Sequence, residues 1–186
     1  MIQLTGGKYK KKKLISIADF VRPTSSLKRE AFFSVIESHA IKNSTNPYDK
    51  KTFLDLFAGI GTMGLEAISR GMDKVIFYEN NHEVLKVLRK NCLEICKKNE
   101  FTIYENDLMN CDLEIEFKNI SLVYIDPPYE KYNLTKLLTN LIDKINNKTL
   151  IGLELSKKDK FEIPKNIKLF QQKKYGKTII YFFKLS

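Results

Sequence analysis

The sequence predicts an α/β fold in which a mostly parallel β-sheet is covered by helices on both faces. From about residue 50 onward, short runs rich in β-branched and aromatic residues alternate with stretches of helical periodicity, which is the pattern of repeated βαβ units. A glycine-rich segment stands where the first strand would meet the first helix. Two β-rich runs around Gly176 close the chain and predict an antiparallel hairpin joined to the parallel sheet.

The predicted elements of this unit follow one another in chain order. Strands are expected at 52–57, 75–78, 101–104, 122–125 and 150–155, and helices at 63–69, 83–98 and 133–146. Gly71 follows the first helix, where a glycine suits a left-handed C-terminal residue. Four small or apolar residues share one face of the second helix: Val84, Leu88, Cys92 and Ile95. That face should pack on the sheet. The closing hairpin should use residues 167–171 and 178–185.

The first fifty residues have a different character, because they are basic and are interrupted by Gly6-Gly7 and Pro23. One helical stretch is expected at about 26–40. We interpret residues 1–45 as a basic appendage, made of a hairpin-like segment and a helix, and residues 46–186 as the main domain. The segment 42–51, with Asn, Ser, Thr and Pro, is the predicted connection.

Composition narrows the class of protein. The formal net charge of +10 favours a polyanionic partner, with nucleic acid as the first candidate; the alternative is that a Lys- and Asn-rich composition raises the charge without functional meaning. Because the sequence has no apolar run of roughly 20 residues, we expect a soluble, cytoplasmic protein. Three cysteines and two histidines predict neither a disulfide framework nor a zinc cluster, so no metal is expected.

The glycine-rich segment carries Gly59, Gly61 and Gly64, which match the pattern G-x-G-x-x-G. Glycine suits this place because a ligand must approach the backbone closely, and the start of the following helix offers unpaired N–H groups. Nicotinamide cofactors and S-adenosylmethionine can both use such a loop. The loop alone therefore does not choose between them.

Acidic residues at the strand ends favour S-adenosylmethionine. Asp55 ends the first strand, where a carboxylate would repel a diphosphate but could accept hydrogen bonds from the amino-acid end of S-adenosylmethionine; capping the next helix is the alternative. Glu79 ends the second strand and could accept from both ribose hydroxyls. Asp107 could accept from an adenine amino group, with the Leu108 N–H facing a ring nitrogen; a plain turn residue is the alternative.

Asp126-Pro127-Pro128-Tyr129 follows the strand at 122–125 and is the most specific motif in the sequence. Two prolines fix the backbone torsions and remove two N–H donors, so the Asp126 side chain and the Pro127 carbonyl can act as a rigid pair of acceptors. An aromatic amine donating two hydrogen bonds fits such a pair, which would orient its nitrogen lone pair. Tyr129 would stack on the base. The alternative is a proline turn with no chemistry.

These motifs together resemble the amino-group methyltransferases of nucleic acids. Further segments shared with one family are Gly6-Gly7-Lys8, Arg22-Pro23-Thr24, Lys28-Arg29-Glu30 and the stretch 65–71. Over nearly its whole length the chain resembles the bacterial 16S ribosomal RNA (guanine(966)-N2) methyltransferase family. The resemblance implies a Rossmann-like class I methyltransferase fold, with a seven-stranded, mostly parallel sheet and a C-terminal antiparallel hairpin.

The resemblance also implies roles for individual residues. Cofactor binding would fall to Asp55, Phe57, Gly59, Gly61, Glu79, Asp107 and Leu108. The catalytic contacts to the target amine would come from Asp126, Pro127, Pro128 and Tyr129. The resemblance also places Arg22 and Thr24 at the border of the active site. Independently of the resemblance, the basic stretch near the start predicts contacts with RNA phosphates by Lys8, Lys10, Lys11, Lys12, Lys13, Arg22, Thr24, Lys28 and Arg29. For this charge run, a merely solvated surface is the alternative.

The implied reaction moves a methyl group from S-adenosylmethionine to the N2 amine of a guanine in 16S ribosomal RNA. The RNA would be in an assembling or assembled small subunit, and the enzyme would act as a monomer. A DNA adenine-N6 methyltransferase is the nearest rival, but this chain has little room for a target-recognition insertion. A nicotinamide-dependent oxidoreductase would leave Asp55 and the Asp126 motif unexplained. A catalytically inactive RNA-binding module would not need intact cofactor and amine motifs.

Overall fold

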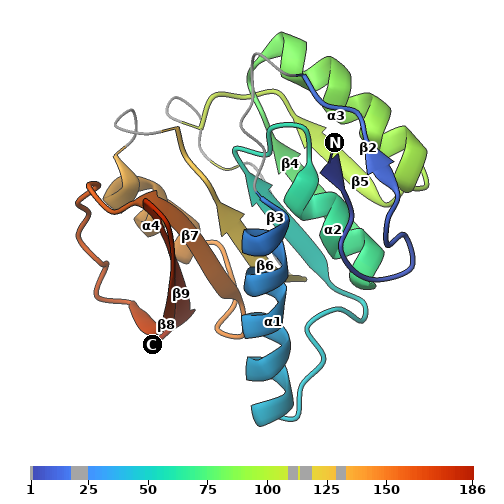
Figure 1. Ribbon diagram of the computed structural model, residues 1–186. Helices are drawn as coiled ribbons and strands as arrows, with labels where there is room; N and C mark the ends of the chain where they lie inside the picture. Colours follow the sequence, from blue (N-terminus) through green and yellow to red (C-terminus); the bar gives the residue numbers. More distant parts are fainter. Residues whose placement is uncertain (1, 18–24, 109–112, 114–118, 129–132) are drawn as a thin grey trace.

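The computed structural model describes residues 2–17, 25–108, 113, 119–128 and 133–186 (Figure 1). The large sheet comprises β3 (Thr52–Leu56), β4 (Lys74–Tyr78), β5 (Phe101–Tyr104), β6 (Ile120–Ile125), β7 (Leu150–Ser156), β8 (Ile167–Tyr175) and β9 (Thr178–Leu185). The helices are α1 (Ser26–Lys42), α2 (Thr62–Arg70), α3 (His82–Ile95) and α4 (Leu134–Ile142). Near the start of the chain, β1 (Ile2–Gln3) and β2 (Lys13–Leu14) form a separate antiparallel pair.

The strand order of the large sheet is β5-β4-β3-β6-β7-β9-β8. Strands β3 to β7 pair in parallel, whereas β9 runs antiparallel between β7 and β8. The predicted seven-stranded sheet with a closing antiparallel hairpin is thereby confirmed. The chain moves outward from β3 to β4 and β5 and then returns to place β6 on the other side of β3. This reversal creates a switch point between β3 and β6, where α/β folds hold their ligands.

Side chains of the central strands alternate between two buried layers. On β3, Phe53 contributes to the layer that includes α1, α2 and α3, while Leu54 contributes to the layer that includes α4. Figure 1 shows α1 and α2 together in front of the sheet. Among the described residues, no helix combines the length and apolar character that crossing a membrane would require.

Two predicted helices end earlier than their periodicity suggested. The helix predicted at 83–98 is α3, and it ends at Ile95 because Cys96 has an extended backbone. The fourth helix of the structure, α4, ends at Ile142. Just beyond it, the Lys144 N–H donates to the Leu141 carbonyl, in a tighter turn, and the Asn146 side-chain amide donates to the Ile120 carbonyl of β6. Tertiary anchoring therefore overrides the helical pattern there.

The interpretation of residues 1–45 as an appendage is corrected by the packing of α1. Phe32 and Phe33 are fully buried, and the Phe32 ring lies 5.1 Å from that of Tyr124 and 5.7 Å from that of Phe182. A Cβ on Gly152 would come within 2.4 Å of the Phe32 ring, so β7 needs glycine to admit this helix. The helix α1 is therefore part of the main core, a role that its weak amphipathic pattern did not indicate.

The hairpin of β1 and β2 is fixed to α2 by backbone contacts. The Lys8 N–H donates to the Ser69 carbonyl at 2.7 Å, and the Tyr9 N–H donates to the Ser69 hydroxyl at 2.9 Å. Gly7 has a left-handed φ of 72°, and a Cβ there would lie 1.7 Å from the Ser69 carbonyl oxygen. The glycine pair that the family resemblance singled out thus permits the hairpin to lie directly on the end of α2.

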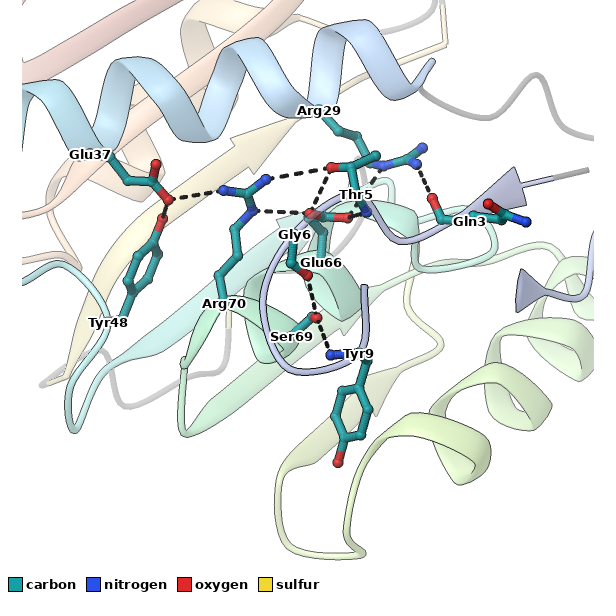
Figure 2. Close-up of polar contacts among 10 residues, drawn as sticks. All are labelled: Gln3, Thr5, Gly6, Tyr9, Arg29, Glu37, Tyr48, Glu66, Ser69 and Arg70. Atoms are coloured by element: carbon teal, nitrogen blue, oxygen red, sulfur yellow. Dashed lines mark hydrogen bonds and ion pairs between the residues drawn. The ribbon is translucent and has the colours of Figure 1, made fainter. Parts of the chain in front are cut away.

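Beside this contact, a buried carboxylate joins three parts of the chain (Figure 2). Glu66 of α2 is fully buried and accepts hydrogen bonds from the Thr5 N–H at 2.8 Å and from Arg70 Nε at 3.0 Å. Arg29 Nε of α1 lies 3.8 Å from Glu66 Oε2, while the Arg29 Nη2 donates to the Gln3 carbonyl. We call Thr5, Arg29, Glu66 and Arg70 the Glu66 cluster.

Candidate active site

The candidate site lies at the carboxyl ends of β3, β4, β6 and β7, on the switch point of the sheet. The ends of β3 and β6 are joined, because the Asp126 N–H, directly after β6, donates to the carbonyl of Leu56, the last residue of β3, at 3.4 Å. In-register pairing of Leu56 with Ile125 places the glycine loop and the Asp126 motif side by side. The two motifs that the sequence separates by about seventy residues are thereby brought together.

The glycine loop turns tightly between β3 and α2. Phe57, Gly59 and Gly61 have left-handed φ values of 64°, 56° and 86°, and the Ala58 N–H donates to the Tyr78 carbonyl at 2.9 Å. A Cβ on Gly61 would come within 2.5 Å of Leu88. A Cβ on Gly64 would press on the Phe77 ring at 2.4 Å. These last two glycines are therefore required by packing of α2 against the sheet and α3, in addition to any role toward a ligand.

Asp55 is only 2% exposed, and its Oδ2 accepts a hydrogen bond from the Gly64 N–H in the first turn of α2 at 2.9 Å. This hydrogen bond is the one expected from the alternative interpretation, in which Asp55 caps the helix α2. Burial raises the pKa of Asp55 well above its ordinary value, the Gly64 hydrogen bond opposes that rise, and the charges of Asp126 and Glu79 add to it. One carboxylate oxygen of Asp55 is thus already used in a hydrogen bond within the protein. Cofactor binding by Asp55 stays a prediction, and it would use the other oxygen.

Glu79, at the end of β4, ties this strand to the glycine loop. Its Oε2 accepts from the Gly59 N–H at 2.9 Å, and its Oε1 accepts from the N–H groups of Asn80 and Asn81 at 3.0 and 2.8 Å. Asn81 in turn caps α3 through its side chain. A carboxylate held by three backbone donors has a fixed orientation, as a residue that recognises ribose hydroxyls would need.

A small pocket opens beside Glu79. It is lined by Phe57, Tyr78, Glu79, Asn80, Asn106 and Leu108. Its walls combine aromatic and apolar side chains with one fixed carboxylate, and Tyr78 is itself supported by stacking on Tyr104 at 5.0 Å. The cavity itself has a volume of only about 20 Å³, so it is the chemistry of its lining that suits a nucleoside, with apolar surface for a flat base and an acceptor for a sugar. Asp107, between two lining residues, is half-buried.

At the end of β6, Asp126 is half-buried, Pro127 is buried and Pro128 is exposed. Burial and the neighbouring Glu154 raise the pKa of Asp126 to about 7, while the Lys28 ammonium opposes the rise. Tyr129 lies outside the described residues, as do Arg22 and Thr24. The described part of the motif therefore sets one acidic side chain at the end of β6, beside the strand that leads into the glycine loop.

The structure corrects part of the predicted RNA surface. Arg29 is 1% exposed and reaches Glu66 and Gln3, so it cannot meet RNA phosphates. The Lys28 side chain is 17% exposed and forms an ion pair with Glu154, which turns it toward the sheet. The remaining described lysines of the prediction are exposed on the hairpin of β1 and β2: Lys8, Lys10, Lys11, Lys12 and Lys13.

Sequence reasoning missed two polar residues of the site, Glu154 and Tyr124. Both are buried, and the Tyr124 hydroxyl donates to Glu154 Oε2. A single acid inside the apolar run Leu150–Leu155 was the available signal for Glu154, because a lone charge in a buried strand needs a partner. Nothing local distinguishes Tyr124 from an ordinary core aromatic residue.

Comparison with known proteins identifies similar chains over almost the full length. A family model described as "Conserved hypothetical protein 95" matches residues 2–184. The chain is 33% identical over 156 residues to "Ribosomal RNA small subunit methyltransferase D" of Buchnera aphidicola subsp. Acyrthosiphon pisum, covering 82% of this chain and 76% of the relative. It is 28% identical over 172 residues to "Putative rRNA methyltransferase YlbH" of Bacillus subtilis, covering 88% and 87%.

Solved structures support the same architecture. "Putative methyltransferase yhhF from Escherichia coli" superposes with a TM-score of 0.82 at 24% sequence identity, covering 99% of this chain and 97% of that one. At this level of identity, the similarity establishes the fold.

Proposed function

The chain belongs to the family described as Conserved hypothetical protein 95 and is an S-adenosylmethionine-dependent methyltransferase of the RsmD type; from this premise we propose that it methylates the exocyclic N2 amine of a guanine in small-subunit ribosomal RNA. The choice of guanine N2 draws on the family resemblance of the Asp126 motif and of the segments around it. A cytoplasmic, monomeric enzyme would suit such a substrate.

The observation that carries the proposal is that the Asp126 motif begins beside the end of the strand that leads into the glycine loop. Asp126 follows β6, Leu56 ends β3, and their backbones share a hydrogen bond at 3.4 Å. A cofactor held along the glycine loop and an amine held by Asp126 would therefore share one edge of the sheet. Group transfer requires this kind of juxtaposition, because the reacting atoms must be held together.

The chain's own residues have a defined task in this reaction. S-adenosylmethionine, when bound, supplies a methyl group carried on a positively charged sulfur. The Asp126 carboxylate and the Pro127 carbonyl accept the two N–H bonds of the amine, which directs the nitrogen lone pair away from them. With the methyl group supplied by that sulfur, positive charge would develop on the amine nitrogen, and the Asp126 carboxylate would stabilise this charge and could take the released proton.

The cofactor would lie between the glycine loop and the pocket beside Glu79. Glu79 would accept from its ribose hydroxyls, while Phe57 and Leu108 would contact its base. Asp55 would face its amino-acid end with the carboxylate oxygen that does not cap α2. Asp107 would accept from the adenine amino group. Each assignment pairs a residue near the site with a donor or an apolar surface of the cofactor.

We further propose that the exposed lysines of the hairpin contact RNA phosphates. Replacing Lys10 and Lys13 together by Ala should weaken RNA binding and reduce the slope of log affinity against log salt by about 0.7 for each phosphate that is no longer neutralised. The matched control is Lys86→Ala on α3, which removes an exposed, ion-paired lysine far along the sequence from the hairpin. An unchanged salt slope in the hairpin variant would remove these lysines from the RNA-binding surface.

The deciding experiment offers small ribosomal subunits that lack the modification to the purified protein with S-adenosylmethionine. Mass spectrometry should map one N2-methylguanosine in the RNA, and Asp126→Ala should abolish it. Methylation of adenine in DNA under the same conditions would instead support the nearest rival. Methyl incorporation unchanged by Asp126→Ala would reject the assigned site.

A further inference from the structure

Lys28 and Glu154 form a charged pair that the RNA-binding prediction did not anticipate. Lys28 lies in the first turn of α1, and its ammonium contacts Glu154 Oε1 on β7. Glu154 is only 2% exposed, and its other oxygen accepts a hydrogen bond from the Tyr124 hydroxyl of β6. Both oxygens of one buried carboxylate are therefore held, by two different elements.

Sheet register places this pair next to Asp126. Tyr124 of β6 is in register with Gly152 of the parallel strand β7. Because side chains alternate along a strand, Asp126 and Glu154, each two residues further on, follow on the same face. The Phe32 ring of α1 packs over Gly152, which fixes the helix whose first turn carries Lys28.

We propose that Lys28, held in place by Glu154, is a positioning residue that keeps the Asp126 side chain in the carboxylate form needed to accept an amine. This inference rests on the proposed function for its consequence in catalysis. The contacts that support the proposal are all made between residues of this chain.

The charges around Asp126 explain why the pair matters. Two acids on the neighbouring strands interact with Asp126: Asp55 on β3 and Glu154 on β7. The Tyr124 hydroxyl group of β6 also interacts with it. Among the described residues, the cation that acts on the Asp126 carboxyl is Lys28 from α1. A protonated Asp126 would donate a hydrogen bond where the amine also donates, so the site works only with the carboxylate. Lys28 favours that form, and Glu154 both opposes it and holds Lys28 in place.

The first test measures the Asp126 carboxyl directly in the full-length protein without ligands. Carbon-13 aspartate labelling gives its NMR titration, assigned by the signal that Asp126→Asn removes. Lys28→Met should raise the titration midpoint by about one pH unit, because a nearby opposite charge is removed. Glu154→Gln should lower it. An unmoved midpoint in Lys28→Met would overturn the proposal.

Matched variants separate charge from simple damage to the fold. The double variant Lys28→Met/Glu154→Gln removes both charges and should return the midpoint toward that of the unaltered protein, and Lys28→Arg should preserve it. Lys86→Met, which breaks an exposed pair with Glu83, should leave it unmoved. If Lys28→Met does not fold, Glu154→Gln decides, since a midpoint that fails to fall would contradict the proposal.

The second test follows methyl transfer to ribosomal subunits against pH. Lys28→Met should displace the rise of kcat to higher pH by a similar amount and leave the KM for RNA and its salt dependence unchanged. A weaker RNA interaction with a smaller salt slope and an unshifted pH profile would instead return Lys28 to the RNA-binding surface. If no methylation of any RNA is found, the proposed function fails while the NMR titration still decides the positioning role.

Discussion

The Glu66 cluster and the Asp126 site both bury carboxylates on the same side of the sheet, but their charges are balanced differently. Glu66 is met by the guanidinium groups of Arg29 and Arg70 (Figure 2). At the carboxyl edge of the sheet, Asp126 interacts with two other acids, Asp55 and Glu154, and with one cation, Lys28. The first arrangement neutralises its acid, and the second leaves negative charge in excess.

This difference indicates what each region does. The Glu66 cluster joins the hairpin, α1 and α2, so its charges hold three segments together. In the Asp126 site, burial and like charge raise the pKa of both Asp55 and Asp126, a cost to the folded protein that a cationic cofactor and an amine donor would offset. Perturbed carboxylates in a cleft are typical of functional sites.

The largest expected effect comes from removing the buried charge of the Glu66 cluster. Glu66→Gln removes the charge that Arg29 and Arg70 share, and it leaves a buried guanidinium without its counter-charge. The free energy of unfolding should fall by about 3–5 kcal/mol, measured by urea denaturation. Glu83→Gln, in the exposed pair with Lys86, should cost less than about 1 kcal/mol. Equal effects of the two variants would contradict the role given to Glu66.

Asp126→Ala should give the opposite result, with activity strongly reduced and stability kept. Removing one preorganised acceptor should lower kcat on the order of 10²–10³-fold, while the free energy of unfolding should stay equal or rise because a buried like-charge contact with Glu154 disappears. Steady-state methylation and urea denaturation of the same preparation make the comparison. A variant that is both active and destabilised would reverse the assignment of the two regions.

Gly7→Ala tests how tightly the hairpin depends on its contact with α2. The added methyl would meet the Ser69 carbonyl oxygen in a left-handed backbone, so we expect a loss of about 1–3 kcal/mol in unfolding free energy. Gly176→Ala is the matched control, because its φ of 54° is also left-handed but no atom lies within 4 Å of the new methyl. If both variants lose the same stability, the cost is backbone strain and the hairpin contact is not critical.

The last expected effect is the pH dependence of stability. With a pKa of about 7 in the folded protein and about 3.9 when unfolded, Asp126 holds a proton in the folded state that the unfolded chain has released. Its contribution therefore makes the free energy of unfolding decrease as pH rises between about 4 and 7. Comparing denaturation at about pH 5 and about pH 7 should show a smaller decrease for Asp126→Asn than for the unaltered protein. An identical decrease would place the responsible group elsewhere.

Much of the fold could be predicted because its signals are local. The alternation of β-rich and helical segments located every strand of the large sheet, and Gly71 correctly ended α2, where it has a φ of 112°. The Asp126 motif and the glycine loop stand at strand ends, and parallel strands present those ends along one edge. Their proximity therefore follows from the fold class.

The helix α1 and the basic residues could not be assigned in this way. Its buried aromatic residues, Phe32 and Phe33, are adjacent in sequence, so they give little helical periodicity. Arg29 and Lys28 look alike as exposed charges in a basic stretch. Their partners, Glu66 and Glu154, lie far along the chain.

By itself, then, the sequence determined the order of elements, the edge of the sheet that carries the motifs, and the family to which those motifs point, since backbone propensity, periodicity and residue spacing are properties of neighbouring residues. Only the tertiary structure decided which charges are buried and which carboxylate each cation meets. The energy of a charge depends on its solvent exposure and on the groups within a few ångströms, and these are set by segments distant in the chain.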